Sequence, residues 1–159
     1  MGDRTSVTLT IPAVYKEAAL VIFGDETPAD SFINGVAKDN PHNLHCFAWY
    51  EVNYGTLPFL DALMAAGIPF DSNWDHGGEY GPGCETCRFT EEGEAIRQTV
   101  SDDGKNPDLG CLLELINQPD ALRNFILRHH AEVTPMTWND QIDYAKRYRL
   151  KQLIQSQQE

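Results

Sequence analysis

The middle of this chain lacks positive charge. No Lys or Arg occurs in the forty-nine residues from Asp39 to Cys87, whereas seven acids and eight of the sixteen aromatic residues fall there. A surface of this composition repels phosphate groups and attracts basic partners, and both effects weaken as the salt concentration rises. The seven acids are Asp39, Glu51, Asp61, Asp71, Asp75, Glu79 and Glu85.

Basic residues are also scarce outside this stretch, except at the end of the chain. Residues 1–145 hold 23 acids and 8 bases, which gives −15, while residues 146–159 hold 4 bases and 1 acid, which gives +3. Phosphate contacts supply most of the affinity of proteins for nucleic acids, and anionic lipids likewise attract basic surfaces. The charge balance therefore predicts a protein that binds neither nucleic acid nor a membrane directly.

Long apolar runs are absent as well. No stretch approaches the roughly 18 apolar residues that span a bilayer. The first residues, Met1 to Val7, lack the apolar core of a secretion signal. We therefore expect a cytoplasmic protein whose thiols stay reduced. A chain of 159 residues with 42% hydrophobic and 23% charged residues can form one globular domain with its own core.

Alternation of apolar and polar residues predicts several strands. Those expected are Val7–Ile11, Leu44–Tyr54, Ile68–Trp74, and a hairpin of Glu85–Thr90 with Ala95–Val100. The strand Leu44–Tyr54 is largely apolar on both faces, so we expect it in the centre of the sheet. Residues 25–43 are polar and contain two prolines, which predicts mostly loop with a short turn around Phe32.

Apolar residues at helical spacing predict helices between and after these strands. One helix should follow Pro12 and stop near Gly24, and a short one should run from a Thr56 N-cap to Ala66. After Pro107 the pattern is helical for the rest of the chain. Three helices are indicated there by Leu112, Leu113, Leu115 and Ile116, by Leu122, Phe125 and Ile126, and by Trp138, Ile142, Ala145 and Leu153.

These elements together predict a single α+β domain over residues 1–159. The sheet should be antiparallel or mixed, with about four to five strands covered by helices, and the C-terminal third should be helical. Thr137 and Asp140 loosely resemble a capping box at the start of the last helix.

Cys84 and Cys87 form the one motif with a recognised chemical meaning. A C-x-x-C turn can hold two thiolates on a zinc ion, which needs two further ligands in tetrahedral geometry. Cys46 and His76 are the expected partners, and His45 and His42 are further candidates. A redox pair is one alternative, although such pairs normally stand at a strand-to-helix junction. The other alternative is that the two cysteines fill space on opposite faces of a strand.

The glycine-rich segment 75–83 is the best candidate for a functional loop. Asp75, His76, Glu79 and Tyr80 offer acid, base and hydrogen-bonding groups there. The loop is not a phosphate cradle, because no Lys lies near and two acids would repel the ligand. His76 and Glu79 could carry the acid–base chemistry of a small hydrolase or transferase. A solvated connection between strands is the alternative.

The leading functional hypothesis is a non-enzymatic protein-binding module, with a basic protein surface as its partner. In one version, the protein is an inhibitor that imitates the charge of nucleic acid. We expect a monomer or a weak homodimer, the latter through Thr137–Tyr148. The expected binding residues are the acids Asp71, Asp75, Glu79 and Glu85 and the aromatic residues Trp74 and Tyr80.

Overall fold

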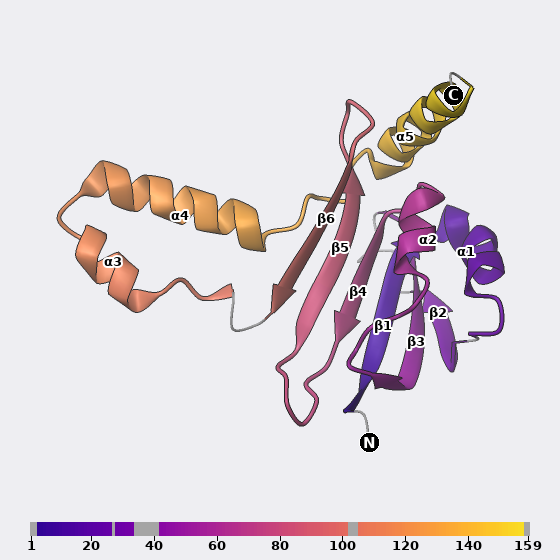
Figure 1. Cartoon of the computed structure of the whole chain (residues 1–159), viewed down its shortest axis with the longest axis horizontal. Helices are drawn as coiled ribbons and strands as arrows, with labels where there is room; N and C mark the ends of the chain where they lie inside the picture. Colours follow the sequence, from indigo (N-terminus) through magenta and orange to yellow (C-terminus); the bar gives the residue numbers. More distant parts are fainter. Residues whose placement is uncertain (1–2, 27, 34–41, 102–104, 158–159) are drawn as a thin grey trace.

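The computed structural model describes residues 3–26, 28–33, 42–101 and 105–157. Within them, six strands form one antiparallel sheet in the order β2-β3-β1-β4-β5-β6 (Figure 1). The α+β class, the antiparallel sheet and the helical C-terminal third are confirmed. The strands are β1 (Arg4–Pro12), β2 (Asp30–Ile33), β3 (Leu44–Asn53), β4 (Phe70–Trp74), β5 (Gly83–Phe89) and β6 (Ala95–Ser101).

The helices fall into two groups. A 3-10 turn, η1 (Ala13–Tyr15), leads into α1 (Lys16–Phe23), which lies with α2 (Leu60–Ala65) and α5 (Gln141–Ser156) over the same face of the sheet. Two further helices, α3 (Leu109–Leu115) and α4 (Pro119–Val133), project beyond β6, away from the rest of the sheet (Figure 1). None of the described helices combines the length and the hydrophobicity needed to cross a bilayer.

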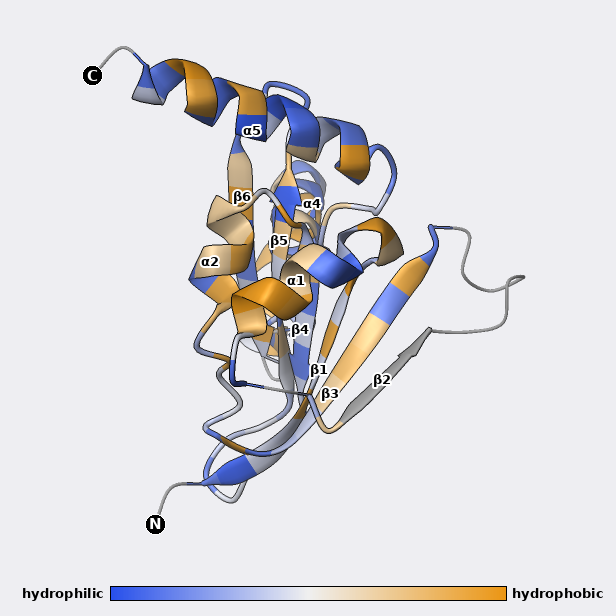
Figure 2. Ribbon diagram, turned by 90° about the vertical axis from the view of Figure 1, so that its right-hand side faces the viewer, coloured by the Kyte–Doolittle hydropathy of each residue, from blue (hydrophilic) through white to orange (hydrophobic). Residues whose placement is uncertain are grey.

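The hydrophobic core lies between the sheet and the first group of helices, and Figure 2 shows apolar segments of α1 and α2 in that layer. Val7, Leu9 and Ile11 face it from β1, as the alternation of apolar and polar residues predicts. Aromatic rings fill its centre, with Phe23 and Phe47 in an edge-to-face contact at a centroid distance of 5.0 Å. No described residue of α3 or α4 belongs to this core.

One strand was missed by the sequence analysis. The prediction of mostly loop for residues 25–43 is wrong at Asp30–Ile33, which form β2 and pair with β3. Four residues are too few to show an alternating pattern, and the unpaired edge of β3 supplies the hydrogen-bonding partners. β2 covers that edge, so β3 has a strand on either side. The prediction that β3 lies in the centre of the sheet is wrong, because β3 is second from the edge and β1 and β4 occupy the centre. The remainder of that stretch, residues 34–41, lies outside the described residues.

Two predicted helix caps are wrong. α2 begins at Leu60 with Phe59 at the N-cap, and the hydroxyl of Thr56 instead donates to the backbone oxygen of Tyr54 at 3.4 Å. α5 begins at Gln141, and its N-cap, Asp140, has a left-handed φ of 60° and makes no side-chain capping bond. A capping box needs the N-cap residue at Thr137. The helix starts too late for that arrangement.

Candidate protein-binding surfaces

The loop between β4 and β5, residues 75–82, is fixed to the N-terminal end of β1. The carboxylate of Asp3 accepts hydrogen bonds from the backbone nitrogens of Gly78 at 2.8 Å and Glu79 at 2.7 Å. These two bonds, the one from Gly78 having the larger effect, lower the pKa of the Asp3 carboxyl. The loop is therefore a defined structure with a charged carboxylate at its base.

Two of the four acids expected to bind a partner lie on this loop. The side chains of Asp75 and Glu79 are exposed, and no ion pair joins either of them to a cation in the described part of the chain. With Asp3 they place three carboxylates at one end of the sheet. Asp75 and Glu79 therefore lie on the same exposed loop.

The other two acids do not join that surface. Asp71 pairs in register with Thr86, so the neighbouring side chain of Glu85 projects from the opposite face of the sheet. Glu85 forms an ion pair with Arg97, which also pairs with Asp61 of α2. The expectation of one patch formed by all four acids is therefore wrong, because strand alternation and pairing with arginines separate them.

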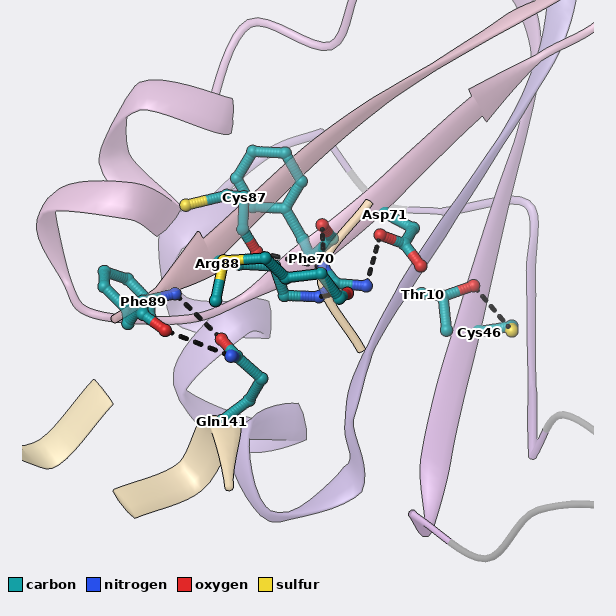
Figure 3. Close-up of polar contacts among 9 residues, drawn as sticks. Thr10, Cys46, Phe70, Asp71, Cys87, Arg88, Phe89 and Gln141 are labelled. Atoms are coloured by element: carbon teal, nitrogen blue, oxygen red, sulfur yellow. Dashed lines mark hydrogen bonds and ion pairs between the residues drawn. The ribbon is translucent and has the colours of Figure 1, made fainter. Parts of the chain in front are cut away.

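Asp71 is part of a buried polar cluster centred on Arg88 (Figure 3). The Arg88 guanidinium lies 2.7 Å from Asp71 Oδ1, and only 3% of the Arg88 side chain and 19% of the Asp71 side chain are exposed. Arg88 also donates to the backbone oxygens of Phe70, Cys87 and Met136 at 2.9–3.0 Å. Burial raises the pKa of the Asp71 carboxyl, and the attraction of Arg88 offsets only part of that effect. The cluster therefore has a structural role.

The aromatic residues expected to contact a partner, Trp74 and Tyr80, pack against this loop. The indole nitrogen of Trp74 donates to the backbone oxygen of Gly81 at 3.2 Å, and its ring packs against Gly83. Any side chain at Gly83 would collide with that ring, which explains the glycine there. Tyr80 is likewise only partly exposed, and its ring lies against Gly77.

The C-x-x-C motif lies within strand β5 and not in a turn. Residues three apart on a strand point to opposite faces. Cys87 belongs to the core, whereas Cys84 lines, with Asp71 and Lys105, a cavity of about 250 Å³ on the other face. Burial raises the pKa of both thiols to about 12, so both stay protonated at neutral pH.

The predicted zinc site is not assembled. Cys46 lies on β3 and contacts the Thr10 hydroxyl at 3.2 Å (Figure 3). Two strands separate it from Cys84, which corresponds to about 14 Å across the sheet at the usual strand spacing. Zinc ligands must all lie within about 2.3 Å of the metal. His76 is in the loop after β4, and the described residues contain no group of three metal-ligating side chains that could hold an ion.

His76 and Glu79, the residues considered for acid–base chemistry, are both exposed. Both residues form hydrogen bonds through their backbones: the Thr5 hydroxyl donates to the His76 oxygen at 3.3 Å, and the Glu79 nitrogen donates to the Asp3 carboxylate at 2.7 Å. Within the described residues, no hydrogen bond joins the two side chains. General acid–base catalysis requires groups positioned within hydrogen-bonding distance of a substrate. Among the residues that the structure describes, no hydrogen bond or ion pair positions the side chains of His76 and Glu79.

A third surface, which was not predicted from the sequence, is formed by α3 and α4. We call residues 109–133 the arm. Both helices have local signals for their start: the Asp108 carboxylate caps α3 by accepting from the nitrogens of Gly110 at 2.6 Å and Cys111 at 3.3 Å. α4 starts with Pro119, followed by Asp120 in the first turn. The arm is therefore encoded as helix by its own sequence.

No residue of either arm helix is buried. Leu113 is 68% exposed and Leu127 is 56% exposed. Pro119, Leu122, Ile126 and Leu127 line a hollow of about 300 Å³ on α4, together with Arg123. A helix in a globular protein normally buries one apolar stripe. The exposed large apolar residues of the arm region are Leu109, Leu113, Ile116, Ile126 and Leu127.

The arm is attached to the sheet through polar contacts near the C-terminal end of α4. The side-chain amide of Gln98 on β6 donates to the backbone oxygens of Ala131, at 3.3 Å, and Glu132. The ring of His129 forms a hydrogen bond with the backbone oxygen of Lys105 at 3.2 Å. These bonds fix where α4 leaves the sheet, while Ile126 and Leu127 farther along the helix stay exposed. The leucine spacing revealed the helices, but it gave no indication that they leave the sheet.

Comparison with known protein families, with curated proteins and with solved structures found no match to this chain.

Proposed function

We propose that this protein is a non-enzymatic protein-binding module and that the arm is the element that contacts its partner. The observation that carries the proposal is that neither α3 nor α4 buries a single residue, although both expose several leucine and isoleucine side chains. Contiguous exposed apolar surface in a folded protein marks an interaction site. The partner should therefore offer an apolar surface of its own.

The charge of the arm supports an apolar partner. Residues 109–133 contain the acids Glu114, Asp120 and Glu132 and the bases Arg123 and Arg128, which gives −1 in a chain of net charge −12. The rest of the chain therefore carries −11. Charged residues occupy 5 of the 25 arm positions, close to the 23% of the whole chain, but in the arm the two signs nearly balance. A partner therefore meets little net charge there.

A binding role is also favoured over a catalytic one by the state of the candidate nucleophiles. The thiols of Cys84 and Cys87, with pKa values raised to about 12, stay protonated at neutral pH. A protonated thiol is a poor nucleophile. His76 and Glu79 are exposed and no hydrogen bond within the described residues connects their side chains.

Site-specific photo-crosslinking tests the proposal. A benzophenone amino acid replaces Leu113 on the arm or, as the matched control, Val21 on α1, which is an apolar residue 81% exposed outside the arm. We expect a discrete crosslinked protein in the native host from position 113 and none from position 21. A Leu127→Lys change in the same chain should abolish that product. Equal crosslinking from both positions, or a product that Leu127→Lys leaves unchanged, would refute the arm as the binding element.

A second candidate surface is the loop 75–82, for which we retain a basic protein partner. The supporting observation is that Asp75 and Glu79 are exposed beside the charged Asp3, with no ion-pairing cation among the described residues. Exposed carboxylates attract a basic protein surface over a distance and so increase the rate at which the two proteins associate. Inhibition by imitation of nucleic-acid charge is one version of this role.

The test of this second surface is a comparison of two charge-matched variants. Asp75→Asn with Glu79→Gln removes two exposed charges from the loop, and Asp25→Asn with Glu26→Gln removes two exposed charges elsewhere. Association with a polycation such as polylysine should weaken, together with its salt dependence, more in the first variant than in the second. If the two variants weaken the association equally, net charge alone explains the binding, and the loop is not the binding surface.

The proposed setting is the cytoplasm, because all four cysteines are free and stay so in a reducing compartment. We further propose that residues 1–159 form a single domain, with the arm as an extension of it.

A further inference from the structure

The exposed surface of this chain is larger than its mass accounts for. A folded monomer of 17.9 kDa is expected to expose about 8,000 Å², whereas this chain exposes 10,060 Å². The excess of about 2,000 Å² is within the roughly 1,000–2,500 Å² that each subunit buries in an obligate homodimer. This total includes residues 1–2, 27, 34–41, 102–104 and 158–159, which lie outside the described ranges, so the excess is the upper limit of the surface that a second copy covers.

The arm contributes five of the fifteen exposed large apolar side chains of the described residues. Its two helices, 7 and 15 residues long, have solvent on several sides, because they contact each other and the sheet only along limited edges. A pair of helices of this length does not stabilise itself in water, since helices in proteins gain most of their stability from packing an apolar face. The arm therefore needs a further surface to pack against.

A second copy of this chain supplies such a surface. The arm carries both a hollow and the exposed leucines that can fill it, so it offers both halves of a two-fold symmetric contact. The hollow is lined by Pro119, Leu122, Ile126 and Leu127. Two copies of a chain with net charge −12 repel each other. The repulsion is weakest where the arms meet, because the arm carries only −1.

We infer that two copies of this chain associate through their arms, with α3 and α4 of each copy packed into a four-helix bundle. This inference rests on the proposed function, because it names the partner of the same binding element. Four-helix packing covers the apolar sides of short helical hairpins that are too small to be stable alone. The sheets and the loops 75–82 of the two copies lie outside this bundle, so both loops stay exposed.

The oligomeric state of the full chain tests the inference. In analytical ultracentrifugation the unmodified chain should sediment with the mass of two copies, 2 × 17.9 = 35.8 kDa. Leu113→Lys and Leu127→Lys should weaken the association by at least about tenfold, because each places a charge in a buried apolar contact. Val21→Lys, the matched control at an exposed apolar position outside the arm, should stay dimeric. Far-ultraviolet circular dichroism verifies that each variant keeps its secondary structure.

A second measurement needs no substitution in the arm's apolar surface. Cys111 is the one exposed cysteine and lies on α3, so it can be labelled selectively with a fluorophore. Mixing donor-labelled and acceptor-labelled wild-type chains should produce energy transfer that excess unlabelled chain removes. The absence of transfer, combined with a single-chain mass, would overturn the inference even if a lysine variant failed to fold.

The outcomes separate this inference from the proposed function. A single-chain mass at every concentration, with a crosslinked product from position 113 that contains another protein, would overturn the dimer and keep the arm as a binding element. A dimer that both lysine variants leave intact would overturn the arm as the dimer interface. A single-chain mass with no crosslinked product from position 113 would overturn both.

Discussion

Gln141 forms both hydrogen bonds of its side-chain amide with the backbone of Phe89. The Phe89 nitrogen donates to Gln141 Oε1 at 2.8 Å, and Gln141 Nε2 donates to the Phe89 oxygen at 3.1 Å (Figure 3). Strand β4 begins at Phe70, which pairs with Cys87, so it does not extend as far as Phe89. The amide of Gln141 takes the place of the missing peptide group and ties the first turn of α5 to β5.

We expect Gln141→Leu to lower the free energy of unfolding by roughly 2–4 kcal/mol, because it leaves a buried backbone N–H and C=O without partners. Urea-induced unfolding measures the difference. Gln155→Leu, at an exposed position of the same helix, is the matched control and should change stability by less than about 0.5 kcal/mol. Equal stability of the two variants would show that the Gln141 amide is not needed to anchor α5.

The buried ion pair of Arg88 with Asp71 should matter far more than the exposed pair of Arg4 with Glu51. Arg88→Met leaves a buried carboxylate unpaired and should lower the free energy of unfolding by about 3–5 kcal/mol. Arg4→Met removes the same chemical group from a pair whose side chains are 54% and 73% exposed, and it should cost at most about 1 kcal/mol. Chemical unfolding of the two variants at neutral pH measures both values. Similar losses would contradict the structural role assigned to Arg88.

Only one of the four cysteines should react rapidly with a thiol reagent in the native protein. Cys111 is exposed, Cys46 and Cys87 are buried, and Cys84 is partly buried with a pKa raised to about 12. We therefore expect one fast-reacting thiol per chain at pH 8 with Ellman's reagent and four after denaturation. Cys111→Ser should abolish the fast phase. Two or more fast thiols in the wild-type protein would contradict the assigned burial of the C-x-x-C pair.

Stability should decrease between pH 9 and pH 12. Burial, the largest cause, raises the pKa of Cys87 from its ordinary 9.0 to about 12. A group with a higher pKa in the folded state stabilises the protein fully below its unfolded pKa, and this contribution is lost as the pH rises toward the folded pKa. Cys87 should add up to about 1.4 kcal/mol per pH unit to the decrease.

Urea unfolding at several pH values between these limits measures that contribution. The Cys87→Ala variant should show a shallower decrease of the unfolding free energy than the wild type, whereas Cys111→Ser, at the exposed position, should follow the wild type. Parallel curves for wild type and Cys87→Ala would mean that the Cys87 thiol ionises alike in the folded and unfolded chains.

The fold was largely predictable because its signals are local. The alternation at Val7, Leu9 and Ile11 located β1, and the spacing of leucines after Pro107 located α3 and α4. Boundaries were less predictable: Thr56 looks like an N-cap, but α2 begins at Leu60, where packing of that residue and Leu63 into the core decides the start. β2 gave no local signal, since its strand conformation depends on the edge of β3.

The candidate site was less predictable than the fold. The sequence identified the loop 75–82 and its exposed acids Asp75 and Glu79. It could not separate them from Asp71 and Glu85, because a count of charges does not record which face of a strand each residue occupies or which arginine lies opposite. The arm was missed for a related reason, since helical periodicity shows that a face is apolar but not what covers it.

The sequence by itself determined the charge imbalance, the elements and the α+β class, because these follow from composition and from periods of two and 3.6 residues along the chain. Only the tertiary structure decided that the C-x-x-C thiols lie on opposite faces of β5 and that two leucine-rich helices leave the sheet. Those outcomes depend on contacts between residues far apart in the chain, and no local pattern encodes such contacts.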